Sequence, residues 1–171
     1  MKVKKISKII FISLFFLSCN RENEFYEYSK ENKFYEYNSE NQFYKLDDEK
    51  ISYDELLSHS PYTILFLWAS SCSYCLIELK KANRRKESFK DVQFYYVNLG
   101  ENKYTVEKAV ELLKLSLNIK KNIVLDREGI LIKEFNIVSI PTYLFLKDGN
   151  LLYKTHFINR SLIEEIFKKD E

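Results

Sequence analysis

Glycine and proline are scarce in this chain, which has three glycines and two prolines among its 171 residues. Each is therefore expected where the backbone requires it, and this expectation applies to Gly149 and Pro141 in particular. Charge of one sign is also lacking, because the formal net charge is only +2. Nucleic acid binding therefore has no electrostatic support. The length provides for one ordinary domain with some additional N-terminal sequence.

The apolar run at the N-terminus is too short to span a bilayer, which takes about 20 residues. Residues 9–17 are apolar except for Ser13, and they follow a lysine-rich stretch, residues 2–8. This order is typical of a secretory signal peptide, which we assign to residues 1–19. The peptide ends in Phe16-Leu17-Ser18-Cys19, which resembles a bacterial lipobox.

The lipobox resemblance implies that Cys19 carries a lipid and anchors the protein outside the cytoplasm, at the inner membrane or the cell surface. An anchor at Cys19 leaves only the two cysteines of one Cys-x-x-Cys motif, so no odd exported thiol remains. The alternative is that Cys19 is an incidental thiol in the leader.

A nine-residue repeat follows the signal peptide. Its copies begin at Asn23 and Asn32, and a partial copy begins at Asn41. Three such copies cannot form a solenoid with its own core, so we interpret residues 20–45 as a spacer between membrane and domain. The Phe-Tyr pair in each copy leaves open that the repeat packs on the domain or rests at the membrane interface.

Residues 46–171 are predicted to form one α/β domain. The expected strands are residues 62–69, 92–97, 122–125, 143–146 and 151–154, and the expected helices are residues 76–82, 105–117 and 162–169, the last with Ser161 as N-cap. Asp148-Gly149 between the last two strands predicts a hairpin. The order predicts a central mixed sheet with helices on its faces.

The motif Cys72-Ser73-Tyr74-Cys75 lies where the first buried strand meets a helix. Two cysteines three residues apart in a first helical turn can form a disulfide, and the helix N-terminus stabilises a thiolate. Cys72 is predicted to be the attacking thiolate, and the deeper Cys75 to resolve the mixed disulfide. A purely structural disulfide is the alternative.

Zinc is a weaker interpretation of the cysteines, because a structural site needs four ligands. The other candidate ligands are the isolated His59 and His156. We expect no metal and no cofactor besides the Cys72–Cys75 disulfide.

The segment from Trp68 to Cys75, together with Ile140-Pro141-Thr142, resembles the thioredoxin superfamily. The helix at 105–117 and the strand at 122–125, inserted between the cysteines and Pro141, are similar to the TlpA/ResA branch of membrane-anchored extracytoplasmic reductases. The resemblance implies a thioredoxin-like fold and a cis bond before Pro141. It also implies substrate contacts by Ile140, Pro141, Trp68, Ser73 and Tyr74.

Three positions affect the site predicted from this resemblance. Ser71 replaces the tryptophan that usually precedes the first cysteine, and Phe66 replaces the buried acid of plain thioredoxin. Glu78 matches a glutamate common in the TlpA/ResA branch, and we take it as the candidate proton acceptor for Cys75. The alternative is that Glu78 is a solvated helix residue.

The leading functional hypothesis is an anchored enzyme that reduces disulfides of exported proteins and is re-reduced by a membrane electron donor. The first alternative is a dithiol oxidase that introduces disulfides. The second is a lipoprotein that keeps the fold as a binding module without catalysis.

Overall fold

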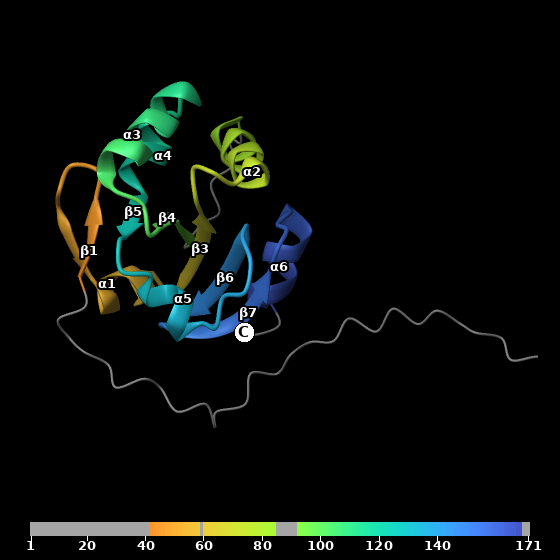
Figure 1. Ribbon diagram of the computed structural model, residues 1–171. Coiled ribbons are helices and arrows are strands. Elements are labelled where there is room, and N and C mark those ends of the chain that lie inside the picture. The colour runs from red at the N-terminus through yellow and green to blue at the C-terminus, as the bar shows by residue number, and fades with distance from the viewer. Residues whose placement is uncertain (1–41, 59, 85–91, 169–171) are drawn as a thin grey trace, which may run out of the picture.

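The computed structural model describes residues 42–58, 60–84 and 92–168. In this part of the chain a seven-stranded mixed sheet has the strand order β2-β1-β5-β4-β3-β6-β7, with helices packed around it (Figure 1). The strands are β1 (Gln42–Lys45), β2 (Lys50–Ser52), β3 (Tyr62–Trp68), β4 (Val92–Leu99), β5 (Ile123–Asp126), β6 (Thr142–Lys147) and β7 (Asn150–Thr155). The helices are α1 (Tyr53–Ser58), α2 (Ser73–Arg84), α3 (Lys103–Leu112), α4 (Leu117–Lys121), α5 (Ile130–Glu134) and α6 (Arg160–Lys168).

The central strand β3 is buried on both faces, which explains why its sequence is continuously apolar. It pairs in parallel with β4 and antiparallel with β6. Phe66 and Trp68 contribute to a core shared with α2, α3 and α6. Leu65 and Leu67 point to the opposite face, where the core includes residues of α1 and α5. The predicted strand at 62–69 and the predicted mixed sheet are confirmed.

The N-terminal boundary of the domain lies earlier than predicted. The spacer was expected to extend to residue 45, but Gln42–Lys45 forms β1, which pairs with β2 and β5. Phe43, from the partial third repeat copy, is fully buried in the core on the α1 and α5 side. Burial of a phenylalanine side chain contributes about 1.5–3 kcal/mol, which favours the placement of this copy in the sheet. The signal peptide, Cys19 and the earlier copies lie outside the described residues.

The inserted segment between the cysteines and Pro141 is present, but its predicted single helix is two helices. The predicted helix at 105–117 is α3 followed by α4, with Lys114 in a left-handed conformation between them. Asn102 caps α3, because its side chain accepts a hydrogen bond from the Thr105 amide. The predicted strand at 122–125 is β5, and the short helix α5 that follows was not predicted.

The predicted hairpin is β6 and β7, joined at Asp148 and Gly149, both of which have positive φ angles. Positive φ at both turn residues suits Asp-Gly and fixes the register of the two strands. The last helix starts earlier than predicted, at Arg160, and Asn159 rather than Ser161 accepts a hydrogen bond from its first turn, from the Leu162 amide at 2.8 Å.

Within the described ranges, none of the helices has both the length and the apolar character needed to cross a membrane.

Candidate active site

The two cysteines of the motif lie at the point where β3 passes into α2. A tight turn leads out of β3, in which the Cys72 amide donates to the Ala69 carbonyl at 3.1 Å. The Leu76 amide then donates to the Cys72 carbonyl at 3.1 Å, so Cys72 immediately precedes the first turn of α2. The positive end of a helix dipole therefore faces Cys72, as the sequence predicted.

Cys72 and Cys75 form a disulfide, with their Cα atoms 5.2 Å apart. Cys75 is fully buried, whereas Cys72 is partly exposed. The Cys75 amide donates a hydrogen bond to Cys72 Sγ at 3.1 Å. Because this donor and the helix N-terminus both stabilise negative charge on Cys72, the accessible sulfur is also the one suited to be a thiolate.

The second half of the site comes from the loop before β6. The Ile140–Pro141 peptide bond is cis, as the resemblance implied. Cys72 Sγ lies 3.9 Å from the Ile140 carbonyl oxygen, so the loop lies directly beside the accessible sulfur. The Thr142 hydroxyl donates to the Ser139 carbonyl at 2.6 Å, which closes the loop on itself.

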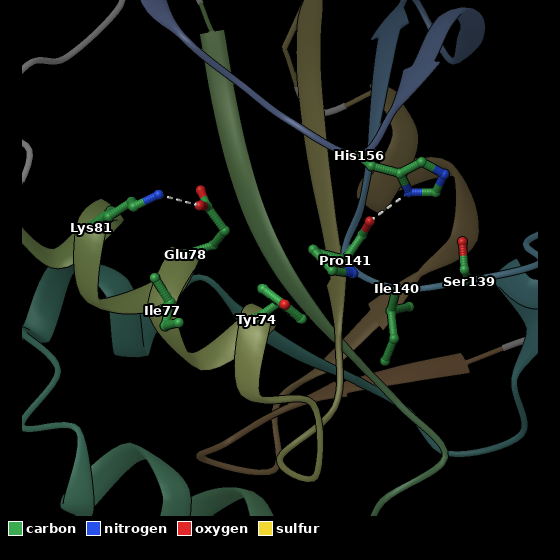
Figure 2. A pocket seen from close by; sticks show the side chains of 8 residues that line it. All are labelled: Tyr74, Ile77, Glu78, Lys81, Ser139, Ile140, Pro141 and His156. Atoms are coloured by element: carbon green, nitrogen blue, oxygen red, sulfur yellow. Dashed lines mark hydrogen bonds and ion pairs between the residues drawn. The ribbon is translucent and has the colours of Figure 1, made fainter.

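His156 holds this loop from the end of β7. Its Nδ1 lies 2.7 Å from the Pro141 carbonyl oxygen, and because a carbonyl only accepts, Nδ1 must carry the proton (Figure 2). Sequence reasoning considered His156 only as a zinc ligand. The hairpin register could have placed it, because Tyr143 pairs with Thr155 and His156 therefore lies across from Thr142.

A groove of about 490 Å³ runs between α2 and this loop. Its lining residues come from three elements that are distant in the sequence: Tyr74, Ile77, Glu78, Lys81, Ser139, Ile140, Pro141 and His156 (Figure 2). The structure thus brings Tyr74, Ile140 and Pro141, three of the predicted substrate-binding residues, to one surface. Tyr74 is 76% exposed and is available to a partner. Ser73 is also exposed, in the first turn of α2.

Trp68 cannot contact a substrate in this structure, and its prediction as a binding residue is wrong. Its exposed fraction is 0%, because the β3 side chains on its face pack into the core beneath α2. In the described part of the chain its Nε1 has no hydrogen-bond partner. The resemblance identified Trp68 by its position in the sequence but did not show whether its side chain is buried or exposed.

Glu78 lies in the wall of the groove. One carboxylate oxygen contacts Lys81 Nζ at 2.7 Å, and the other accepts a hydrogen bond from the Tyr143 hydroxyl at 3.0 Å. Only 18% of the Glu78 side chain is exposed. The contacts are therefore those of a partly buried, partnered carboxylate rather than of a solvated helix residue.

Glu101 is a site residue that sequence reasoning missed. Its carboxylate contacts Ser70, in the turn before Cys72, and Asn98, near the end of β4. Ser70 and Glu101 are 31 positions apart, so no local pattern could have joined them. The parallel register of β3 with β4, which places Trp68 opposite Asn98, is the signal that could have done so.

No group of three or more histidine, cysteine, aspartate or glutamate side chains suited to a metal ion occurs among the residues that the structure describes. His59 lies outside them. The Cys72–Cys75 disulfide is a reactive group present at this site.

The accessible cysteine, the buried cysteine and the adjacent cis-proline on a mixed sheet define a protein of the thioredoxin-like class. Comparison of sequences gives the family: residues 33–159 match the AhpC/TSA family model, and the chain belongs to this family. Sporulation thiol-disulfide oxidoreductase A of Bacillus subtilis (strain 168) is 35% identical over 98 residues, which are 54% of this chain and 57% of that protein. The chain thus matches little more than half of that relative's length.

Solved structures agree on the fold. The crystal structure of StoA from Bacillus subtilis has a TM-score of 0.57 at 26% identity, with coverage of 76% of this chain and 99% of that one. A thioredoxin-like protein from Aeropyrum pernix has a TM-score of 0.57 at 17% identity, covering 75% and 88%. A thiol-disulfide oxidoreductase from Bacteroides fragilis has a TM-score of 0.56 at 22% identity, covering 75% and 95%. The predicted thioredoxin-like fold is therefore confirmed.

Proposed function

We propose that this chain is a membrane-anchored, extracytoplasmic thiol-disulfide oxidoreductase that reduces disulfides of exported proteins. One observation carries the proposal: the Cys72–Cys75 disulfide lies at the N-terminus of α2, with its accessible sulfur 3.9 Å from the Ile140 carbonyl. A purely structural disulfide has no need of an accessible sulfur beside an open groove. A relative named as a thiol-disulfide oxidoreductase, from Bacillus subtilis, supports the same activity.

The reaction uses the two sulfurs in sequence. The Cys72 thiolate of the reduced protein attacks one sulfur of a substrate disulfide, forming a mixed disulfide and releasing the other substrate sulfur as a thiolate. Cys75, once deprotonated, attacks Cys72 Sγ and releases the second substrate sulfur. Two electrons pass from the protein to the substrate, and the Cys72–Cys75 disulfide remains. A membrane protein carrying a dithiol then supplies two electrons to restore the reduced state.

The groove beside the disulfide provides the docking surface. A substrate strand beside the Ile140 backbone would place its own sulfur next to Cys72 Sγ. Tyr74 and Pro141 offer apolar contact on either side of this position. Because most of the groove's lining is apolar or already partnered, a segment of unfolded exported polypeptide fits it better than a strongly charged partner.

Glu78 is proposed as the acceptor of the Cys75 proton. A partly buried carboxylate one helical turn after Cys75 is placed to take this proton, and Tyr143 and Lys81 fix its orientation. Glu78→Gln keeps the hydrogen-bonding shape but cannot accept the proton. We expect it to slow resolution of the mixed disulfide by at least about tenfold, given the 10²–10⁴-fold typical of general base catalysis. Glu164→Gln, an equal loss of charge on α6, is the control.

Trapping of the mixed disulfide tests the activity. In the Cys75→Ser protein no second thiol is present to resolve a mixed disulfide on Cys72. This variant should therefore accumulate a covalent adduct when its reduced form is mixed with glutathione disulfide. Cys72→Ser protein should form far less adduct, because Cys75 is buried. Equal labelling of both variants, or of neither, contradicts the assignment of Cys72 as the attacking thiolate.

Location is tested separately. Cys19→Ala in the full chain should abolish incorporation of a labelled fatty acid and move the protein from the membrane fraction to the soluble extracytoplasmic fraction. Unchanged membrane association would overturn the lipid anchor and leave the proposed thiol chemistry intact.

A further inference from the structure

The Glu101 carboxylate receives three hydrogen bonds. The Ser70 amide donates to Oε2 at 2.8 Å, and the Ser70 hydroxyl donates to Oε1 at 2.5 Å. The Asn98 side-chain amide donates to Oε2 at 2.6 Å. Hydrogen bonds to a charged acceptor are shorter and about twice as strong as those between neutral groups, so this cluster fixes Ser70 firmly.

Ser70 belongs to the turn that carries the attacking sulfur. The turn runs from Ala69 to Cys72 and is closed by the Cys72 amide on the Ala69 carbonyl. Ser70 is the first of its two central residues. A carboxylate that holds both the amide and the hydroxyl of Ser70 therefore fixes the orientation of the whole turn, and with it the position of Cys72.

The placement of Glu101 is not explained by the needs of its own segment. Glu101 lies between β4 and α3, and the N-cap of α3 is Asn102, whose side chain accepts from the Thr105 amide at 3.0 Å. Glu101 does not cap that helix. Its carboxylate instead contacts Ser70, in the turn that follows the neighbouring strand β3, and the fully buried Asn98 of β4.

We propose that Glu101 is a positioning residue for Cys72. This inference rests on the proposed thiol-disulfide chemistry and deepens it. The carboxylate holds the turn so that Cys72 Sγ remains next to the Cys75 amide and the Ile140 carbonyl. A turn fixed in this way holds Cys72 Sγ in the reactive geometry before the substrate binds. This matters because a misplacement of a reacting atom by about 1 Å can lower the rate 10²-fold.

Glu101 could act on Cys72 by holding the turn in place or by its negative charge, and two substitutions distinguish these two effects. Glu101→Ala removes every contact to Ser70. Glu101→Gln can retain all three, because its carbonyl oxygen accepts from the Ser70 and Asn98 amides while its NH₂ group donates to the Ser70 hydroxyl. Positioning therefore predicts that glutamine rescues the function and alanine does not.

The test uses the full-length reduced chain and the pH profile of Cys72 alkylation by iodoacetamide. We expect Glu101→Ala to slow alkylation roughly tenfold to a hundredfold near neutral pH, and Glu101→Gln to remain within about threefold of the wild type. Glu111→Gln, an exposed glutamate on α3, is the matched control and should equal the wild type.

A second measurement reports on the turn itself. Amide hydrogen exchange at Ser70 should accelerate by tenfold or more in Glu101→Ala, and much less in Glu101→Gln. If Glu101→Ala does not fold, Ser70→Ala, which removes only the hydroxyl contact, should still change the Cys72 alkylation profile in the same direction by a smaller factor.

Three results would overturn the inference. An alkylation profile of Glu101→Ala equal to that of Glu111→Gln would show that Cys72 does not depend on Glu101. A Glu101→Gln profile equal to Glu101→Ala would show that charge acts instead of position. If the Cys72–Cys75 pair of the wild type does not cycle with glutathione, both the proposed function and this inference are overturned. If the wild type cycles and Glu101→Ala has an unchanged alkylation profile, only the inference is overturned.

Discussion

Two carboxylates lie at the C-terminal ends of the neighbouring parallel strands β4 and β5, and both accept hydrogen bonds from backbone amides, but these amides belong to parts of the molecule with different roles. Glu101 follows β4 and accepts hydrogen bonds from the turn that carries Cys72. Asp126 ends β5 and accepts from the amides of Ile130 and Leu131, at 2.8 and 2.9 Å, at the start of α5. Leu99, the last residue of β4, pairs with Asp126, so the two carboxylates share one edge of the sheet.

Asp126 and Glu101 differ in the segment whose amides donate to the carboxylate. The amides at Asp126 begin a helix that packs Leu131 into the core. The amide at Glu101 belongs to the reactive turn. We therefore expect substitutions at Asp126 to change stability and leave the chemistry of Cys72 unaltered, whereas substitutions at Glu101 should change the reactivity of Cys72.

The largest effect should come from the sulfur itself. Cys72→Ser removes the accessible nucleophile, so we expect disulfide reduction with dithiothreitol as electron donor to fall to the uncatalysed rate. The free energy of unfolding of the reduced protein should change by less than about 0.5 kcal/mol, because Cys72 is only partly buried. Residual activity above that of Cys72→Ser/Cys75→Ser would contradict the account.

Next in size is the loss of the hydrogen bonds that Asp126 accepts at the start of α5. Asp126→Ala leaves two amides without their acceptor in a buried place, and we expect it to lower the free energy of unfolding by about 2 kcal/mol. Urea unfolding of the reduced protein measures this loss. The rate of Cys72 alkylation should equal that of the wild type. A slower rate in a folded Asp126→Ala variant would contradict the expectation that Asp126 affects only stability.

A smaller effect is expected at the loop before β6. His156→Ala removes the donor to the Pro141 carbonyl, and we expect a loss of about 1 kcal/mol in transition-state stabilisation, equal to a fivefold lower kcat/KM for a protein disulfide. His156→Asn, whose amide can donate in the same direction, should recover part of it. Unchanged kcat/KM in both variants would remove His156 from the site.

The smallest effect is the pH dependence contributed by Asp126. Burial raises the pKa of this carboxyl above its ordinary value, against the lowering effect of the amides of Leu131, Ile130 and Gly129. A raised folded-state pKa means that the stabilising contribution is complete below the unfolded value, about 3.9, and is lost as the pH rises through the folded value. The stability difference between wild type and Asp126→Asn should therefore become less favourable to the wild type as the pH rises from 4 to 7. A difference independent of pH would contradict this assignment.

The sequence made the reactive parts of the site predictable because they are local. Cys72 and Cys75 are joined through one helical turn, and Pro141 stands in a short motif. The contacts of Glu101 and His156 span 31 and 15 positions, so they emerge only from the pairing of β3 with β4 and of β6 with β7.

Two of the wrong predictions, on Trp68 and on Phe43, also have physical causes. Trp68 lies on a strand that is buried on both faces. The continuous apolar sequence of such a strand does not show whether any of its side chains reach the surface. Phe43 was assigned to the spacer because it belongs to the repeat. It is the one fully buried residue of β1, whose other side chains are exposed or partly exposed, and it packs into the core of the domain.

The equilibrium reduction potential of the Cys72–Cys75 couple decides between a reductase, an oxidase and a pair without redox function. The full chain without its signal peptide would be titrated against dithiothreitol, with mass-shift detection of free thiols. We expect a potential near that of thioredoxin, ~−270 mV, because the protein is proposed to be a reductase. A potential nearer ~−120 mV would identify an oxidant instead, and a pair that does not cycle would contradict the enzymatic account altogether.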